Sequence, residues 1–287
     1  MNFTKMHGLG NDYLYLYCQE TPENIEKLAI KYSDRHFGAG SDGIICILPS
    51  SVADFKMRIF NADGSEAMMC GNGIRCVGKY VFDRGYTDKT QIDVETLSGI
   101  KHLKLTVEDG KIAQVTVDMG HAKVSQQQEV KVACGYFYDE VINAFCASRN
   151  GAEPIPVIPV DMGNPHVVSV IGDGVSSLPA VDELNLVVKP VVNPVLESDQ
   201  NAEFVRIDAT DETSDHGSAT MRVNERGVGE TLSCGTGLCA TGVTLLAKTG
   251  IHHWTITVRG GTLLVDVSDD RVFLTGSATL VGRVELL

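Results

Sequence analysis

The chain has 287 residues, 43% of them hydrophobic, and a formal net charge of −13 at pH 7. This length is enough to bury a sizeable core, and no apolar run approaches the roughly 18 residues that a membrane-spanning helix needs. An acidic chain with scattered lysine and arginine residues is a poor binder of nucleic acids and anionic membranes.

The N-terminal residues lead into a loop rich in Gly, Asn and Asp and lack the continuous apolar run of a signal peptide. We therefore expect a cytoplasmic protein whose eight cysteines are reduced. Cys70 and Cys76 are six positions apart, and Cys234 and Cys239 are five apart. Neither spacing fits a structural zinc knuckle, so we expect no bound metal.

The first half of the chain begins with a predicted surface helix over residues 23–36 that ends at Gly38. The apolar run 44–48 predicts a buried strand. A longer helix is expected directly after Cys70, because apolar residues recur there at helical spacing, and Gly85 is a suitable stop. The apolar positions of the two helices are Ile25, Leu28 and Tyr32, then Ile74, Val77 and Val81.

The second half repeats these signals. In the first half, residues 103–117 read as a hairpin with its turn at 108–110, and in the second half residues 262–275 read as its counterpart, turning at 268–270. Between them, the stretches near 149–160 and 189–201 contain Pro or Gly and predict loops or linkers. Another helix is expected directly after Cys234, with Leu238, Leu245 and Leu246 on its apolar side and Gly250 as its stop.

An internal duplication explains this recurrence. Segments 57–78 and 221–242 align without a gap and share Met, Arg, Glu, Cys and three Gly residues. Upstream, Gly-Asn recurs at residues 10–11 and 163–164, each time before a predicted strand. The sequence therefore predicts an α+β fold of two pseudo-symmetric halves, each consisting of strands around a central helix.

Each duplicated Cys-Gly-x-Gly turn places a cysteine immediately before a predicted helix. The N-terminus of a helix carries N–H groups without intrahelical acceptors and a partial positive charge. Such a position lowers the pKa of a thiol, so we expect Cys70 and Cys234 to be partly ionised and able to act as bases. The same N–H groups can bind a carboxylate.

Two such turns facing one cleft would place Cys70 and Cys234 on opposite faces of a single substrate carbon. One thiolate would remove the α-proton while the other thiol returned a proton to the opposite face. The helix dipoles acting on the carboxylate would stabilise the carbanion. This arrangement needs no cofactor, and the sequence offers no clear pyridoxal-phosphate site. The duplication therefore favours a two-base amino-acid epimerase.

The same residues resemble the diaminopimelate epimerase family. Matching stretches span nearly the whole chain in family order: 5–13, 35–43, 60–66, 69–76, 162–166, 201–205 and 225–237. The resemblance implies two halves, each a β-sheet wrapped around a central helix, with the C-terminal strand returning to the first half. The halves are expected at 1–122 plus 276–287 and at 123–275.

The family likeness also implies a reaction, the conversion of LL- to meso-diaminopimelate toward lysine and peptidoglycan, with the active site in the cleft between the halves. Cys70 and Cys234 match the acid/base pair, and His166 and Glu225 match residues that assist proton movement. The main chain at four residues would hold the reacting carboxylate, and six side chains match substrate-binding positions. The main-chain set is Gly71, Asn72, Gly235 and Thr236. The side-chain set is Asn11, Asn61, Asn164, Asn201, Glu225 and Arg226.

Two departures from the family pattern and three alternatives stay open. Gly43 stands where some members carry Gln, and Asn224 where an aromatic residue is common. The alternatives are a proline-racemase-like enzyme, a non-catalytic binding module or thiol sensor, and a metal enzyme using His252 and His253. The distal-recognition set of Asn164, Asn201 and Arg226 disfavours the first, because a monocarboxylic amino acid needs no such set. A homodimer is compatible with the sequence, which does not fix the oligomeric state.

Overall fold

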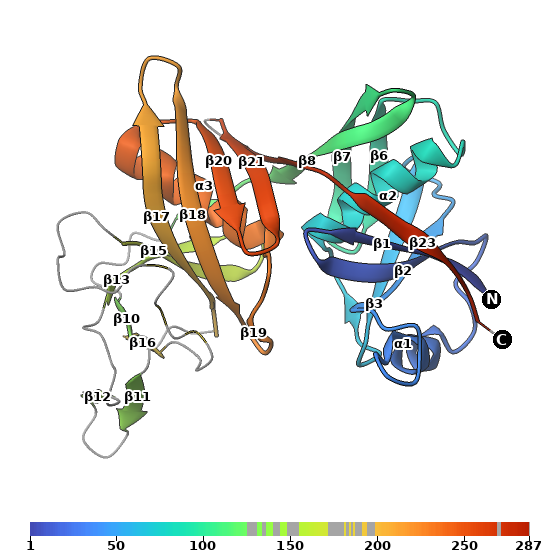
Figure 1. Ribbon diagram of the computed structural model, residues 1–287, viewed down its shortest axis with the longest axis horizontal. Coiled ribbons are helices and arrows are strands. Elements are labelled where there is room, and N and C mark those ends of the chain that lie inside the picture. The colour runs from blue at the N-terminus through green and yellow to red at the C-terminus, as the bar shows by residue number, and fades with distance from the viewer. Residues whose placement is uncertain are drawn as a thin grey trace. The chain divides into compact units, whose positions relative to one another are not determined.

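Two compact units make up the computed structural model, which describes residues 1–124, 131–133, 136–139, 144–147, 155–171, 181, 184, 186, 191–193, 199–268 and 271–286 (Figure 1). Unit 1 comprises Met1–Asp118 and Leu274–Leu287, and unit 2 comprises Met119–Phe273. The chain passes between the units within two strands, β8 (Lys111–Gly120) and β22 (Val272–Gly276).

Unit 1 is a β-sheet around one central helix. Besides β8 and part of β22, its elements are β1 (Asn2–Gly8), β2 (Asn11–Tyr17), α1 (Ile25–Ser33), β3 (Gly43–Leu48), β4 (Phe55–Asn61), β5 (Glu66–Ala67), α2 (Gly71–Asp83), β6 (Gln91–Thr96), β7 (Gly99–Glu108) and β23 (Thr279–Glu285). β23 pairs antiparallel with β1, so the C-terminal strand does return to the first half.

Unit 2 has the same design around helix α3 (Gly235–Thr249). Its main strands are β9 (Lys123–Val124), β14 (Ile158–Asp161), β15 (Pro165–Val170), β17 (Asn201–Asp211), β18 (His216–Glu225), β19 (Gly229–Glu230), β20 (His253–Val258) and β21 (Gly261–Val267). Short strands form two further small sheets: β10 (Lys131–Ala133), β11 (Tyr136–Asp139), β12 (Ala144–Ala147), β13 (Ile155–Pro156) and β16 (Val191–Asn193).

Strand pairing follows one order in both units. In unit 1, β1 pairs antiparallel with β2, β2 parallel with β3, β3 antiparallel with β4, and β4 parallel with β6. In unit 2, β14, β15, β17, β18 and β20 pair in the same sequence and with the same directions. The duplication predicted from the sequence is therefore present as a repeated α+β topology.

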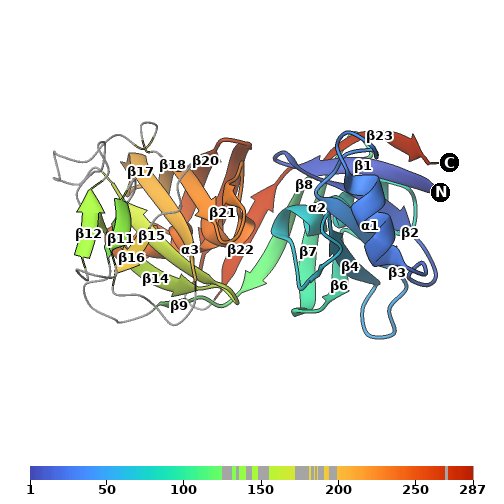
Figure 2. The same ribbon diagram turned by 90° about the horizontal axis from the view of Figure 1, so that it is seen from below.

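The apolar run of β3 is buried on both faces, because the two helices of unit 1 cover opposite sides of this strand. Ile44, Cys46 and Leu48 pack in a cluster with Ile25 and other residues of α1. Ile45 points the other way, with its Cδ1 atom against the first turn of α2. Alternate residues of a strand face opposite sides of the sheet, so a strand between two helices is apolar throughout. Figure 2 shows α1 and α2 within this unit.

The predicted central helices and their stops are confirmed. α2 begins after Cys70 and ends at Asp83, with Gly85 at φ +75°, and α3 begins after Cys234 and ends before Gly250 at φ +78°. Ile74, Val77, Val81, Leu238 and Leu245 are buried, and Leu246 is partly buried. The hairpin of β7 and β8 turns at residues 109–110, within the predicted turn.

The first helix is shorter than the predicted range 23–36. α1 covers only Ile25–Ser33, because the Asp34 side chain accepts hydrogen bonds from the N–H groups of His36 and Phe37, both at 2.7 Å. This local turn satisfies backbone donors without continuing the helix. The described parts of the predicted loops 149–160 and 189–201 contain the strands β13, β14 and β16, so the loop prediction is wrong there. Other parts of these ranges, and part of the turn 268–270, lie outside the described residues.

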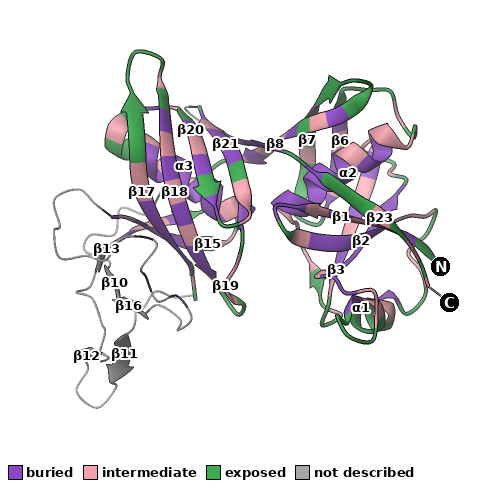
Figure 3. Ribbon diagram, in the orientation of Figure 1, coloured by how far each residue is buried: buried purple, intermediate pink, exposed green. Residues whose placement is uncertain are grey.

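Among the described helices, none combines the length and the apolar character that a membrane crossing requires. Figure 3 shows that burial differs between the two ends of the β17–β18 hairpin. Residues 201–205 are buried, whereas residues 208–212 at the tip are exposed. The buried end carries the candidate site residues of unit 2.

Packing of β18 against β20 gives a test of the unit 2 core. Gly217 lies beside Trp254 in the strand register, and a Cβ atom on Gly217 would approach the indole Cη2 atom to 2.6 Å. The ring cannot move freely, because its Nε1 donates to Ile251 O at 2.9 Å. Gly217→Ala should therefore destabilise the protein by about 1–3 kcal/mol, as overpacked cores do.

The measurement is thermal unfolding followed by circular dichroism. Gly282→Ala is the matched control, because Gly282 also lies in a strand and a Cβ atom there meets nothing within 4 Å. An unchanged unfolding temperature in Gly217→Ala would contradict the described packing of Trp254.

Candidate active site

Cys70 occupies the N-cap of α2 in unit 1. Its backbone is extended, at φ −139° and ψ 116°, and its carbonyl oxygen accepts the first helical hydrogen bond, from Ile74 N at 2.9 Å. The Gly73 N–H donates to the Sγ atom at 3.3 Å, and the thiol in turn lies 3.2 Å from Asn11 Oδ1. The sulfur is therefore held between a helix N-terminus and an amide side chain.

A charged network orients Asn11. Its Nδ2 donates to Asp42 Oδ2 at 2.7 Å, which leaves Oδ1 facing Cys70. Arg35 donates to both Asp42 and Asp12 at 2.8 Å. Burial acts to raise the pKa of Asp12, but hydrogen bonds and charges from Arg35 and Lys5 outweigh it and leave that pKa below its ordinary value. Asp42 and Arg35 were not among the predicted site residues, although both lie in the 35–43 stretch that resembles the family.

Gly71 and Asn72 form the start of α2, where helix geometry leaves backbone N–H groups available for an anion. Arg75 fixes this turn from inside: it is fully buried and donates to Asn72 Oδ1 at 2.8 Å and to Gly71 O at 3.0 Å. The sequence did not single out Arg75. Asn61 ends β4, and its Nδ2 donates to Ser65 Oγ at 3.1 Å, within the turn that follows the strand.

Cys234 is the equivalent N-cap of α3 in unit 2, at φ −116° and ψ 114°. It is only 6% exposed, and its Sγ lies 3.5 Å from Thr236 Oγ1. Thr236 Oγ1 also accepts from Asn164 Nδ2 at 3.2 Å. Gly235 and Thr236 begin the helix, as Gly71 and Asn72 do in unit 1.

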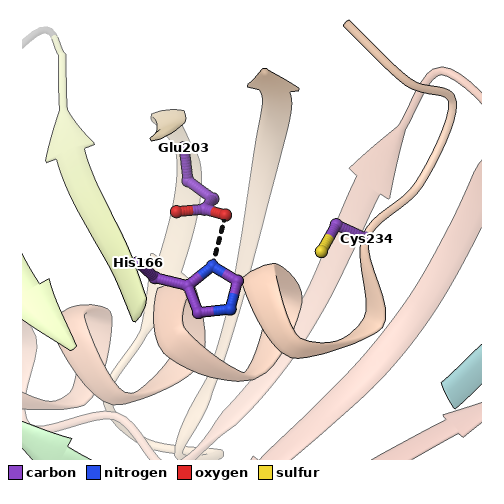
Figure 4. A group of neighbouring side chains, drawn as sticks. All are labelled: His166, Glu203 and Cys234. Carbon is purple, nitrogen blue, oxygen red and sulfur yellow. Dashed lines mark hydrogen bonds and ion pairs between the residues drawn. The ribbon is translucent and has the colours of Figure 1, made fainter. Parts of the chain in front are cut away.

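A buried histidine–carboxylate pair lies beside Cys234 (Figure 4). His166 Nδ1 is 2.7 Å from Glu203 Oε1, and its Nε2 is 3.1 Å from Asn164 Oδ1. The side chains of His166 and Glu203 are both 0% exposed. Glu203 was missed as a site residue, although it lies within the 201–205 stretch that resembles the family.

Glu225 ends β18 near the same helix N-terminus, and Arg226 follows it. Thr231 donates a short hydrogen bond to Glu225. Burial raises the pKa of Glu225 above its ordinary value, and the charge of Glu203 adds to this, against hydrogen bonds from Thr231 and Cys234. Arg226 is exposed, and its backbone N–H donates to Asn201 Oδ1 at 2.9 Å.

The electrostatics at Cys234 contradict the lowered thiol pKa expected from its helix position. Burial raises the pKa of Cys234 well above its ordinary value, and the charges of Glu225 and Glu203 raise it further. The hydroxyl of Thr236 and the N–H of Gly237 oppose this but do not outweigh it. Desolvation and nearby negative charge both disfavour a thiolate. Cys234 therefore holds its proton at neutral pH in the free protein.

The predicted site residues thus form two groups, one in each unit. Unit 1 brings together Cys70 and Asn11 with the start of α2, and unit 2 brings together Cys234, Asn164, His166, Thr236 and Glu225, with Asn201 and Arg226 adjoining. Within the described residues, the one three-donor group suited to a metal ion is His166, Glu203 and Cys234, whose ligand atoms lie within 4.8 Å of one another. The hydrogen bond between His166 and Glu203 engages one ligand atom of each of these two residues, Nδ1 and Oε1.

The two departures from the family pattern have local consequences. A Cβ atom on Gly43 would overlap the Phe60 carbonyl oxygen, so this backbone would have to shift to carry Gln. Asn224 is buried, and its Nδ2 donates to Leu186 O at 3.0 Å. The polar side chain that replaces an aromatic one is therefore satisfied by a backbone acceptor.

These environments predict unequal reactivity of the two cysteines toward iodoacetamide, which attacks thiolates. At pH 7, Cys70, which is partly exposed, should be alkylated before the buried Cys234. Glu225→Gln removes a negative charge that raises the pKa of Cys234, so labelling of Cys234 at fixed pH should accelerate by about 3- to 10-fold. Glu212→Gln, at the exposed tip of the same hairpin, is the control. Peptide mapping that finds equal labelling rates, unaffected by Glu225→Gln, would contradict this electrostatic account.

Known proteins resemble the chain over its whole length. The family model described as Diaminopimelate epimerase matches residues 3–125 and 158–281. Proteins named Diaminopimelate epimerase from Acetivibrio thermocellus and Methanococcus maripaludis are 47% and 43% identical, each alignment covering 100% of this chain and 99% of the relative.

Solved structures show the same fold at much lower identity. A phenazine biosynthesis protein of the PhzF family from Bacillus anthracis has a TM-score of 0.70 at 17% identity, covering 100% of this chain and 99% of that one. A probable proline racemase from Agrobacterium radiobacter has a TM-score of 0.64 at 16% identity, covering 100% and 92%. The fold is thus shared with racemases and PhzF proteins, and the full-length sequence matches show that the chain belongs to the diaminopimelate epimerase family.

Proposed function

We propose that this protein epimerises LL-2,6-diaminopimelate to meso-diaminopimelate by a two-base reaction without a cofactor. The observation that carries the proposal is the pair of cysteines, each capping the N-terminus of the central helix in one copy of a duplicated fold. The assignment of diaminopimelate as the substrate follows from the family to which the chain belongs. The product serves lysine and peptidoglycan precursor synthesis.

Each unit supplies one thiol to the reaction. The thiolate of one cysteine takes the α-proton, so the C–H bond breaks, an S–H bond forms and the electron pair stays on the α-carbon. The other cysteine then gives its thiol proton to the opposite face and becomes the thiolate. Because Cys234 holds its proton in the free protein, it serves as the acid in the first turnover and Cys70 as the base.

The helix N-termini hold the reacting carboxylate in this proposal. Backbone N–H groups at Gly71, Asn72, Gly235 and Thr236 point toward an anion at these positions and stabilise the negative charge that develops on it. The second amino-acid head of the substrate has a carboxylate and an ammonium group. The exposed guanidinium of Arg226 suits the carboxylate, and the remaining proposed substrate contacts are Asn11, Asn61, Asn164, Asn201 and Glu225.

His166 and Glu225 are proposed to assist proton movement at Cys234, since both lie beside it. We further propose a cytoplasmic location, which the free state of all six described cysteines supports. A measurement of the molecular mass in solution tests whether the protein forms a homodimer.

The direct test is incubation with LL-diaminopimelate in D2O, followed by NMR and chiral chromatography. We expect deuterium at one α-carbon together with the meso product, at a rate that a chelator such as EDTA does not change. Proline is the comparison substrate, because the fold is shared with a proline racemase. Faster inversion of proline, or activity that is lost to the chelator and restored by zinc, would refute the proposal.

Single cysteine variants test the two-base step. Cys70→Ala and Cys234→Ala should each lower kcat by about 10⁴-fold, at the upper end of what an acid–base group contributes, because inversion needs a donor opposite the base. Cys18→Ala removes a thiol whose described partner is Cys46, away from either helix N-terminus, and should keep activity. Near-normal turnover in Cys234→Ala would remove the two-base reaction from consideration.

A further inference from the structure

The duplication provides an internal comparison of the two cysteine environments. The Gly-Asn pairs at 10–11 and 163–164 are equivalent, which aligns Tyr13 with His166. Tyr15 lies opposite Ile45 in the β2–β3 register, and the equivalent Val168 lies opposite Glu203 in the β15–β17 register. Ile45 and Glu203 therefore occupy the same place in the two units, each next to the central helix.

Within the described residues, only unit 2 has a histidine–carboxylate pair at these two places. In unit 1 the equivalents are Tyr13, whose pKa burial raises well above its ordinary value, and the apolar Ile45. In unit 2 they are His166 and Glu203, both inaccessible to solvent. A buried carboxylate is costly unless it is paired and hydrogen-bonded. Within the described residues, Glu203 Oε2 has no hydrogen-bond partner, so the pairing with His166 through Oε1 is the principal compensation.

The turn that carries Cys234 is shaped around this carboxylate. A Cβ atom on Gly237 would lie 2.5 Å from Glu203 Oε1, whereas at the equivalent Gly73 it would meet the methyl group of Ile45. The second glycine of the Cys-Gly-x-Gly turn therefore gives Glu203 the room it needs against the first turn of α3.

Both ring nitrogens of His166 face acceptors. Nδ1 faces Glu203 Oε1, and Nε2 faces Asn164 Oδ1. A histidine that donates from both nitrogens is an imidazolium. The ring, the Glu203 carboxylate and the Cys234 sulfur lie within 4.8 Å of one another, and Glu225 is the other charged group at the thiol.

We propose that Glu203 is a positioning residue for Cys234: through Nδ1 it holds His166 in place as a fixed imidazolium beside the thiol. This cation stabilises the thiolate that forms when Cys234 gives up its proton, and it offsets the two carboxylates around the sulfur. The expected change in kcat rests on the proposed function, whereas the protonation state of the His166 ring does not. In the described part of unit 1, the positions equivalent to His166 and Glu203 carry Tyr13 and Ile45.

Glu203→Gln tests the proposal, because it keeps the size and an acceptor but removes the charge. We expect kcat to fall by about 10- to 100-fold with KM changed less than about 2-fold, the range for a residue that orients a reacting group through another. In ¹⁵N NMR of the ring, His166 should have both nitrogens protonated at pH 7.5 in the wild type and one in Glu203→Gln. His166→Asn assigns the signals.

Two further variants separate positioning from simple packing. Gly237→Ala should lower kcat in the same direction, because its Cβ displaces the carboxylate. Ser169→Ala is the control: this fully buried hydroxyl on β15, three residues after His166, has no partner within the described part of the chain, and its loss should leave kcat unchanged.

A neutral His166 ring in the wild type would overturn the proposal, as would Glu203→Gln with normal kcat. If Glu203→Gln does not fold, the wild-type ring spectrum still decides. A wild-type protein that shows the imidazolium but exchanges no α-proton of diaminopimelate would refute the proposed function and leave the assignment of Glu203 to His166 intact.

Discussion

The central helix of each unit begins directly after a cysteine in extended conformation, and most of the surrounding structure serves to hold that junction. The extended backbone lets each cysteine carbonyl accept the first helical hydrogen bond, and at Cys70 the sulfur also accepts from the Gly73 N–H. In unit 1, Arg75 fixes the junction from within and Asn11 from outside. Two properties meet there: a sulfur that can carry a proton and a dipole that attracts a carboxylate.

Duplication supplied two copies of this junction, and divergence made them electrostatically different. At the Cys70 copy, the sulfur contacts the Asn11 amide and the Gly73 N–H, and Asn11 in turn contacts Asp42, which Arg35 pairs with. The Cys234 copy has carboxylates and a histidine in direct proximity. An enzyme that inverts a carbon with two thiols needs one of them protonated and the other ionised when the substrate arrives. The surroundings of Cys234 favour the protonated form of that thiol.

The sequence predicted features that depend on local spacing. The starts and stops of both central helices follow from a cysteine, apolar residues at helical intervals and a terminal glycine, all within about 15 residues. The tight turn of the β7–β8 hairpin is equally local. The first helix was predicted too long, because Asp34 reads as helix-compatible until its side chain is seen capping the N–H groups that follow it.

What the sequence missed depends on contacts between distant positions. Asp42 reaches Asn11 across 31 residues, and Glu203 reaches His166 across 37. Both separations are far longer than the periodicity of a helix or strand, so sequence spacing does not indicate that these side chains meet. The wrong direction of the Cys234 pKa has the same origin, because a helix position is visible in the sequence whereas full burial between two carboxylates is not.

Because the chain returns to unit 1 through β23, unit 1 can complete its fold only after unit 2 has been synthesised. β1 has β2 on one edge and β23 on the other, and all of unit 2 lies between them in the sequence. At about 5–20 residues per second, a ribosome takes on the order of ten to thirty seconds to add unit 2. Throughout that interval the β1 edge has no partner strand, and an open edge invites pairing with other chains. The first unit to begin is thus the last to be completed, and unit 2 is the first that can fold as a whole on the ribosome.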